Sequence, residues 1–205
     1  MPIADGITQL KQDFDDVKEA GKKAERDTFW SVFQKYGEPA NYFRAFDQDR
    51  FNDENYNPQY DIACASGSTT ATYIFYNSPN ITDVKVPIRA ENCTALDFSF
   101  YGCKALTTIP LLVVGENTSY HQNTFWNCTA LVNLTMGGTI GKNGFKLLWS
   151  TLLTHDSLMS IINALKDYSE DTSGTEWVVT IGNDNIAKLT ADELAVADAK
   201  GWQVV

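Results

Sequence analysis

The sequence predicts an α/β repeat protein: a leucine-rich-repeat solenoid with an N-terminal helix and a C-terminal helical cap. Phe75, Phe100 and Phe125 stand 25 residues apart, and a period of roughly 20 to 29 residues is typical of leucine-rich repeats. Apolar or small residues follow each phenylalanine at the same offsets: Ser78, Cys103 and Cys128, then Ile81, Leu106 and Leu131, then Val84, Ile109 and Leu134. Each repeat of such a protein adds one short strand and one return segment to a stack.

The composition favours a folded, acidic protein and argues against several partners. Of the 205 residues, 43% are hydrophobic and 12% are aromatic, which is enough for a core. The net charge is −10 and the basic residues are scattered, so we expect no nucleic-acid partner. The chain has no run of about 18 apolar residues, so we expect no membrane insertion. The N-terminal MPIADGITQL lacks the basic and apolar regions of a signal peptide, so none is predicted.

Residues 1–36 are predicted to be an N-terminal helix, and residues 37–205 the repeat domain. Over residues 7–24, apolar or small residues alternate steps of three and four, as in a coiled coil: Ile7, Leu10, Phe14, Val17, Gly21 and Ala24. Two interpretations stay open. The helix forms the stalk of a homo-oligomer, or it packs alone on the end of the solenoid. The next apolar residues shift in phase and are expected to cap the first repeat: Phe29, Trp30 and Phe33.

The repeats themselves occupy residues 70–136. The preceding segment, residues 40–66, is aromatic and polar without a clear period, and we interpret it as an irregular first turn. Alternation with a period of two places strands near residues 81–86, 106–111 and 131–136. The apolar members of each strand then face the core, and the remaining residues face outward.

The last quarter, residues 150–205, predicts a cap. Thr154 is placed to N-cap a helix. The apolar face of that helix comprises Leu158, Ile161, Ile162 and Leu165. A strand is predicted at residues 178–181, after a polar turn. We expect these elements to cover the final apolar edge of the stack, because a solenoid needs a capping element at its end.

The final helix carries its own boundary signals. Thr190 and Glu193 have the spacing of a capping box. Gly201 follows the helix where a left-handed residue is favoured, and Trp202 is expected to pack behind it.

All four cysteines are expected to be free thiols. Cys103 and Cys128 share a column in adjacent turns, which stack roughly 4.8 Å apart, and this distance also permits a disulfide. Inward-facing cysteines of a ladder are more often small buried hydrophobic residues. The chain has no Cys-x-x-Cys pair and only two histidines, so no zinc site is predicted.

No calcium site or cofactor is predicted either. The segment from Asp47 to Glu54 has alternating acids, but the sixth and twelfth positions of an EF-hand loop would be Asn52 and Pro58 instead of glycine and glutamate. We interpret it as a solvated acidic loop. Structural roles are expected for the two histidines, His121 and His155.

The repeats FYGCKALTTI at residues 100–109 and FWNCTALVNL at residues 125–134 resemble those of BspA-like leucine-rich-repeat proteins. The run from His155 to Trp202 is similar to the C-terminal part of many such proteins. Residues 19–34 resemble the lead-in of family members from gut bacteria and their prophages. The resemblance covers roughly residues 19–205. It implies a right-handed solenoid and a role in binding or adhesion, with no catalytic residues to transfer.

Two rows of residues are candidates for ligand binding. If the ladder phenylalanines point inward, the aromatic residues that follow them should form a row along one flank: Tyr76, Tyr101 and Trp126. Such a row suits a sugar face or a protein partner. The alternative is that these rings pack under the N-terminal segment or between return segments. The second row lies on the strand side: Asp83, Thr108 and Asn133.

The sequence therefore predicts a recognition protein and not an enzyme. It shows no pairing of a nucleophile with a base and no nucleotide-binding or zinc-protease motif. We expect a non-catalytic adhesion or recognition protein with a protein or glycan partner, outside the cell or at its surface. The alternative is a phage virion component, such as a tail fibre or receptor-binding tip, whose N-terminal heptads form an oligomeric stalk.

Overall fold

The computed structural model describes residues 62–63, 72–120 and 123–205, all within one compact unit, Pro39–Val205. The predicted N-terminal helix lies outside the described residues, as do its heptad positions and most of the segment before the repeats. Those heptad positions are Ile7, Leu10, Phe14 and Val17. In the described part of the chain, no helix is long and apolar enough to cross a membrane.

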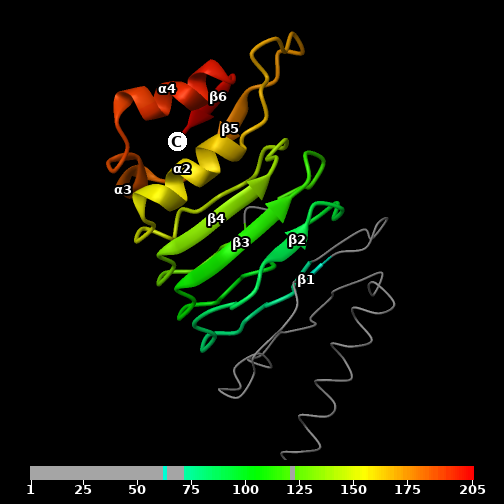
Figure 1. Cartoon of the computed structure of the whole chain (residues 1–205), viewed down its shortest axis with the longest axis vertical. Coiled ribbons are helices and arrows are strands. Elements are labelled where there is room, and N and C mark those ends of the chain that lie inside the picture. The colour runs from blue at the N-terminus through cyan, green and yellow to red at the C-terminus, as the bar shows by residue number, and fades with distance from the viewer. Residues whose placement is uncertain (1–61, 64–71, 121–122) are drawn as a thin grey trace, which may run out of the picture. The chain divides into compact units, whose positions relative to one another are not determined.

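Four parallel strands form a sheet in sequence order (Figure 1). They are β1 (Ile62–Ala63), β2 (Ile88–Ala90), β3 (Thr108–Val114) and β4 (Asn133–Gly138). Pairing joins residues about one repeat apart, since Ile88 lies opposite Leu112 and Thr108 lies opposite Asn133. Parallel neighbours require the chain to return to the same end before each new strand. The return segments also stack, as Ala95 pairs in parallel with Ser119.

The three ladder phenylalanines form the centre of the core. Phe75, Phe100 and Phe125 are fully buried, and their rings stack with centroids 5.4 Å and 5.1 Å apart. Phe145 continues the column with its ring centroid 5.6 Å from that of Phe125, now edge to face. The inward direction on which the predicted outer aromatic row depends is therefore observed.

The other predicted columns are buried as well. The six strand-side residues expose no more than 1% of their surface: Ile81, Leu106, Leu131, Val84, Ile109 and Leu134. In the small-residue column, the Sγ atoms of Cys103 and Cys128 donate to the carbonyl oxygens of Phe75 and Phe100, at 3.2 Å and 3.1 Å. Neither cysteine forms a disulfide, and burial raises the pKa of Cys128 well above its ordinary value, which keeps the thiol unreactive.

The expectation that all four cysteines are free is wrong for Cys93, which is disulfide-bonded. Cys93 follows β2 and lies outside the column of Cys103 and Cys128. The spacing between repeats therefore gives no information on whether Cys93 forms a disulfide. The remaining cysteine, Cys64, is outside the described residues.

The strand boundaries differ from the predicted ones. β3 and β4 begin two residues later than expected, because Leu106 and Leu131 belong to turns in which their N–H groups bond to Cys103 and Cys128. The strand predicted at residues 81–86 is wrong: β2 begins only at Ile88.

A turn explains the late start of β2. Lys85 has a φ of 64°, and its N–H donates to Oδ1 of Asp83 at 2.8 Å. A carboxylate that binds the backbone two residues on forms a local turn, which interrupts an extended strand.

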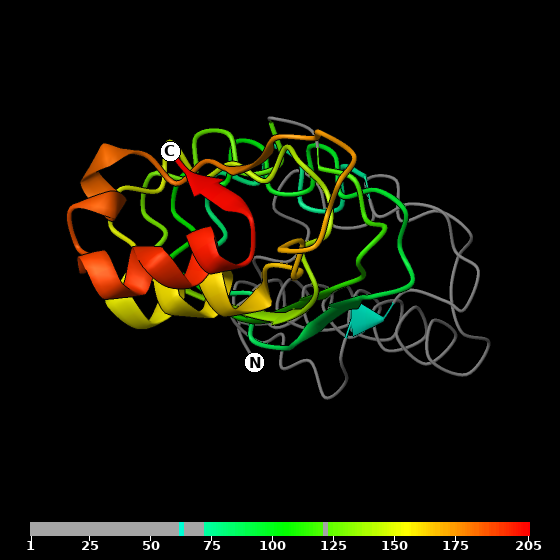
Figure 2. The same ribbon diagram turned by 90° about the horizontal axis from the view of Figure 1, so that it is seen from above.

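The cap consists of three helices and a two-stranded sheet. Its elements are α2 (His155–Ala164), β5 (Trp177–Val179), α3 (Asn183–Ile186), α4 (Ala191–Ala199) and β6 (Trp202–Val204). The N-cap at Thr154 and the capping box are confirmed, and Gly201 has the positive φ expected of it, 79°. Neither α3 nor β6 was predicted. Figure 2 shows α4 lying alongside α2.

Helix α2 occupies the place of a next strand beside β4 (Figure 1). Oγ of Ser157 accepts from the N–H of Leu134 at 2.9 Å and is 3.3 Å from the carbonyl oxygen of Val132. Ser160 makes the equivalent pair of bonds to Met136 and Leu134. The hydroxyl groups thus satisfy the backbone groups that a fifth strand would otherwise bind.

Candidate functional site

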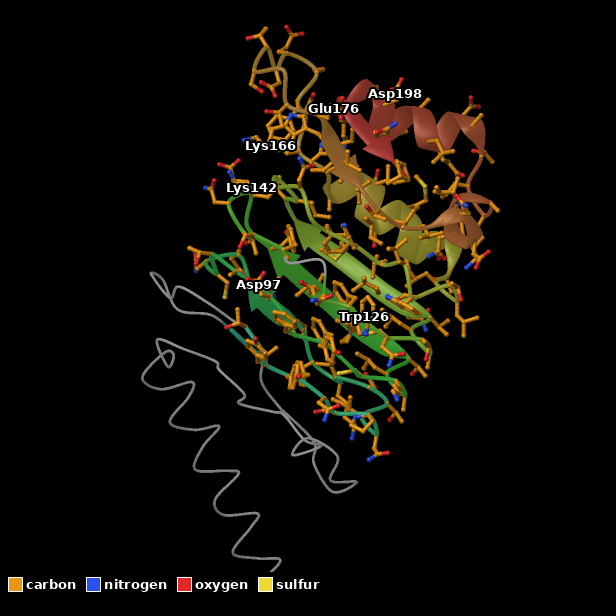
Figure 3. All side chains as sticks on the ribbon, turned by 180° about the vertical axis from the view of Figure 1, so that it is seen from behind. Asp97, Trp126, Lys142, Lys166, Glu176 and Asp198 are labelled. Atoms are coloured by element: carbon orange, nitrogen blue, oxygen red, sulfur yellow. The ribbon has the colours of Figure 1, made fainter. Side chains whose placement is uncertain are left out.

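The predicted aromatic row is present. Tyr76, Tyr101 and Trp126 stack in order, with ring centroids 5.1 Å and 6.5 Å apart. Each follows an inward-pointing phenylalanine, so its own ring points away from the core. Figure 3 shows Trp126 among the side chains of the repeat turns.

Backbone bonds between turns set the spacing of this row. The N–H of Asn77 donates to the carbonyl of Tyr101 at 2.7 Å, and the N–H of Gly102 donates to that of Trp126 at 2.8 Å. Asn77, Gly102 and Asn127 follow the three ring residues and have φ values of 54°, 78° and 64°. Asparagine and glycine are the residues that best tolerate this left-handed conformation. This Asn–Gly–Asn column was visible in the sequence and was missed.

The row continues to Trp149, which sequence reasoning also missed. The ring of Trp149 lies 4.7 Å from that of Trp126 at an interplanar angle of 58°. Because Trp149 comes 23 residues after Trp126, a search at a fixed period of 25 passes over it. The signal that could have found it is the shortened copy Phe145-Lys-Leu-Leu-Trp149, in which a phenylalanine again precedes an indole.

A second, shorter row runs beside the first. Tyr73 and Phe98 stack at 4.9 Å and are 10° from parallel. The ring of Tyr73 lies 5.1 Å from that of Tyr76, and the ring of Phe98 lies 5.9 Å from that of Tyr101. These contacts hold the first two rings of the main row in place.

The two ends of the aromatic row differ in exposure. Tyr76 and Tyr101 are half-buried, whereas Trp126 and Trp149 expose 39% and 42% of their surface. Parallel stacked rings cover each other's faces, and the tilt between the two indoles breaks that stacking. The open ring faces therefore lie at the tryptophan end of the row.

A pocket of about 310 Å³ lies at this end. It is lined by Asn123, Phe125, Trp126, Lys146, Leu148 and Trp149. Leu148 is 51% exposed and extends the apolar surface beyond the two indoles. We call these residues, apart from the buried Phe125, the indole pocket.

The strand-side candidates also fall into one row. Asp83 pairs with Thr108 across the first two turns, and Thr108 pairs with Asn133 across the next two. The Asp83 carboxylate already accepts the N–H of Lys85. Asn133 is exposed, and Thr108 is half-buried with its Oγ1 3.5 Å from that of Thr107. This row is more polar than the indole pocket.

The described histidine has a structural partner. Nε2 of His155, in the first turn of α2, lies 2.7 Å from Oε1 of Glu193, the residue that closes the capping box of α4. The hydrogen bond to Glu193 raises the pKa of His155. The pKa of Glu193 is lowered, chiefly by the backbone N–H of Thr190. The other histidine, His121, lies outside the described residues, as does the acidic segment 47–54. In the described part of the chain, no group of three or more His, Cys, Asp or Glu residues could hold a metal ion.

No protein-family model matches this chain, and no curated protein or solved structure is significantly similar to it.

Proposed function

We propose that the chain is a non-catalytic recognition or adhesion protein, a leucine-rich-repeat solenoid that binds a protein or glycan partner. The resemblance of its repeats to BspA-like proteins motivates this proposal, and the parallel strands that advance by one repeat at a time support it.

The observation that carries the proposal is the exposed apolar surface of the indole pocket. Trp126, Leu148 and Trp149 are each more than a third exposed and line one pocket. Large apolar side chains gathered on a surface mark sites of interaction, and tryptophan is enriched among the residues that dominate binding energies. The rigid stack beneath them lowers the entropy cost of binding.

The disulfide at Cys93 supports a location outside the cytoplasm. Disulfides persist in oxidising surroundings such as the cell exterior, and on virion and cell surfaces. Both contexts considered for this protein, a bacterial surface and a virion, meet that condition.

The proposal is tested by retention on coated surfaces. The full chain is passed over mucin glycoprotein, over extracellular matrix proteins and over whole bacterial cells. We expect saturable retention on at least one surface. Retention should fall with Trp126→Ser or Asn133→Arg and stay unchanged with Asp198→Asn on the exposed face of α4. Absence of retention on all three surfaces, or equal retention of every variant, contradicts the proposal.

A second candidate is a virion component with an oligomeric N-terminal stalk. The heptad spacing of Ile7, Leu10, Phe14 and Val17 favours it. Light scattering of the full chain and of Leu10→Asp would decide this point. A dimer or trimer that becomes a monomer in the variant supports the stalk, and a monomer in both excludes it.

A further inference from the structure

The indole pocket has the size of a site for one small ring. Its volume is about 310 Å³, at the lower end of the roughly 300 to 1,000 Å³ of small-molecule sites. Such sites combine apolar and aromatic walls with a few polar groups that orient the ligand. Here the walls are the two indoles and Leu148, and the polar groups are Lys146 and Asn123.

Within residues 72–120 and 123–205, the side-chain donors of this pocket have no hydrogen-bond acceptor. The structure describes four tryptophans, and they divide into two pairs. The indole N–H groups of Trp177 and Trp202 donate to Asp171 and to the carbonyl of Lys166, each at 2.7 Å. Neither indole N–H at the pocket has an acceptor among the described residues. The Lys146 ammonium likewise forms no ion pair in that part of the chain.

These side-chain donors favour a ligand with several hydrogen-bond acceptors. Indole N–H and ammonium groups only donate, and the Asn123 carboxamide both donates and accepts. A ligand that fits must present several oxygen acceptors at its rim and an apolar face to the tilted indoles. A purely aliphatic group would leave the donors unpaired. A phosphate would not use the ring faces, and the net charge of −10 disfavours highly anionic ligands.

We propose that the indole pocket binds one pyranose ring of a glycan. The C–H face of the sugar lies on the indole faces of Trp126 and Trp149. Its hydroxyl oxygens accept from the two indole N–H groups and from Lys146, and Asn123 bonds a further hydroxyl. This inference rests on the recognition function proposed above and names the chemical class of the partner.

The test is a titration of the full chain with three uncharged tetrasaccharides, built from β-linked glucose, from N-acetylglucosamine and from galactose. Tryptophan fluorescence follows binding, and saturation-transfer NMR identifies the sugar protons in contact. We expect a saturable change with at least one probe, and an affinity at least about tenfold lower in Trp149→Ala.

Two variants separate binding from folding. Trp149→Phe keeps a ring face without the N–H and is expected to bind between the wild type and Trp149→Ala. Leu152→Ala removes an apolar side chain that is 56% exposed but does not line the pocket, and it should bind as the wild type does. Absence of a saturable change with all three probes at about 10 mM overturns the proposal, as does equal affinity of wild type and Trp149→Ala.

The outcome is distinct from that of the surface-retention experiment. If the chain is retained on a coated surface but none of the three sugars binds, the recognition function stands and the glycan assignment fails. If no surface retains the chain, the recognition function fails, and the sugar titration still decides whether the pocket binds a pyranose.

Discussion

The repeat turns, residues 72–140, and the cap, residues 150–205, are stabilised in different ways. In the repeat turns, the same kind of side chain makes the same contact in each copy, as the stacked column of Phe75, Phe100 and Phe125 shows. The cap instead relies on individual polar contacts that do not recur from one repeat to the next. Nζ of Lys200, for example, donates to two carbonyls in the last turn of α2, those of Ile162 and Asn163.

This difference between repeated packing and individual contacts shows how a stack of parallel strands can be terminated. Each repeat leaves an open strand edge that the next repeat covers, and an edge left open invites pairing with other chains. The cap covers the edge of β4 with a helix, and the hydroxyl groups of Ser157 and Ser160 bond the strand's backbone. Periodic packing builds the stack, and a few individual hydrogen bonds terminate it.

The largest expected effect is in the phenylalanine column. Phe100→Ala removes a ring that stacks on both neighbours and should lower the free energy of unfolding by about 3 to 5 kcal/mol. Chemical denaturation measures it, with Phe100→Leu as the control that refills part of the space and costs less. A loss below about 1 kcal/mol would show that the column is not central to the stack.

A smaller loss of stability is expected for a substitution where the cap contacts β4. Ser157→Ala leaves the buried N–H of Leu134 without its acceptor and should cost about 1 to 3 kcal/mol. The matched control is Ser119→Ala, whose side chain is exposed. If both variants unfold at the same denaturant concentration, the hydroxyl does not hold the edge. An increase of self-association in Ser157→Ala alone would sharpen the comparison further.

The smallest effect is a pH dependence within the cap. The pKa of His155 is raised above 6.5. Its contribution to the free energy of unfolding is therefore complete below pH 6.5 and is lost as pH rises through the folded-state pKa. The pKa of Glu193 is lowered below 4.5, so its contribution is complete above pH 4.5 and is lost as pH falls through the folded-state pKa. The pair therefore stabilises most between about pH 4.5 and 6.5.

His155→Gln tests this dependence. The difference in melting temperature between wild type and variant should be greatest near pH 5.5, midway between these two ordinary values, and shrink toward both pH 3 and pH 9. NMR titration of the imidazole measures the pKa directly. A pKa at or below 6.5 would show that the Glu193 contact does not form in solution.

Local signals in the sequence were read correctly where one residue type has one strong preference. Threonine at an N-cap and glycine after a helix act through bonds within a few residues, and Thr154, Thr190 and Gly201 behave as predicted. The strand at residues 81–86 was wrong because alternation of apolar residues does not reveal a turn formed by an aspartate, here Asp83. Trp149 was missed because the last turn is shorter than the others.

The amino-acid sequence by itself determined which residues are buried in the repeat turns and which row of rings lies outside them. Both follow from a period of 25 residues, because equivalent positions in a repeat meet equivalent surroundings. Only the tertiary structure determined which rings of that row are exposed to solvent. Tyr76 and Tyr101 are covered by stacking on their neighbours, whereas the tilt between Trp126 and Trp149 exposes their faces. The turn that carries Trp149 is bonded to the cap, where the N–H of Leu147 donates to the carbonyl of Thr180, and no local pattern encodes this contact between distant segments.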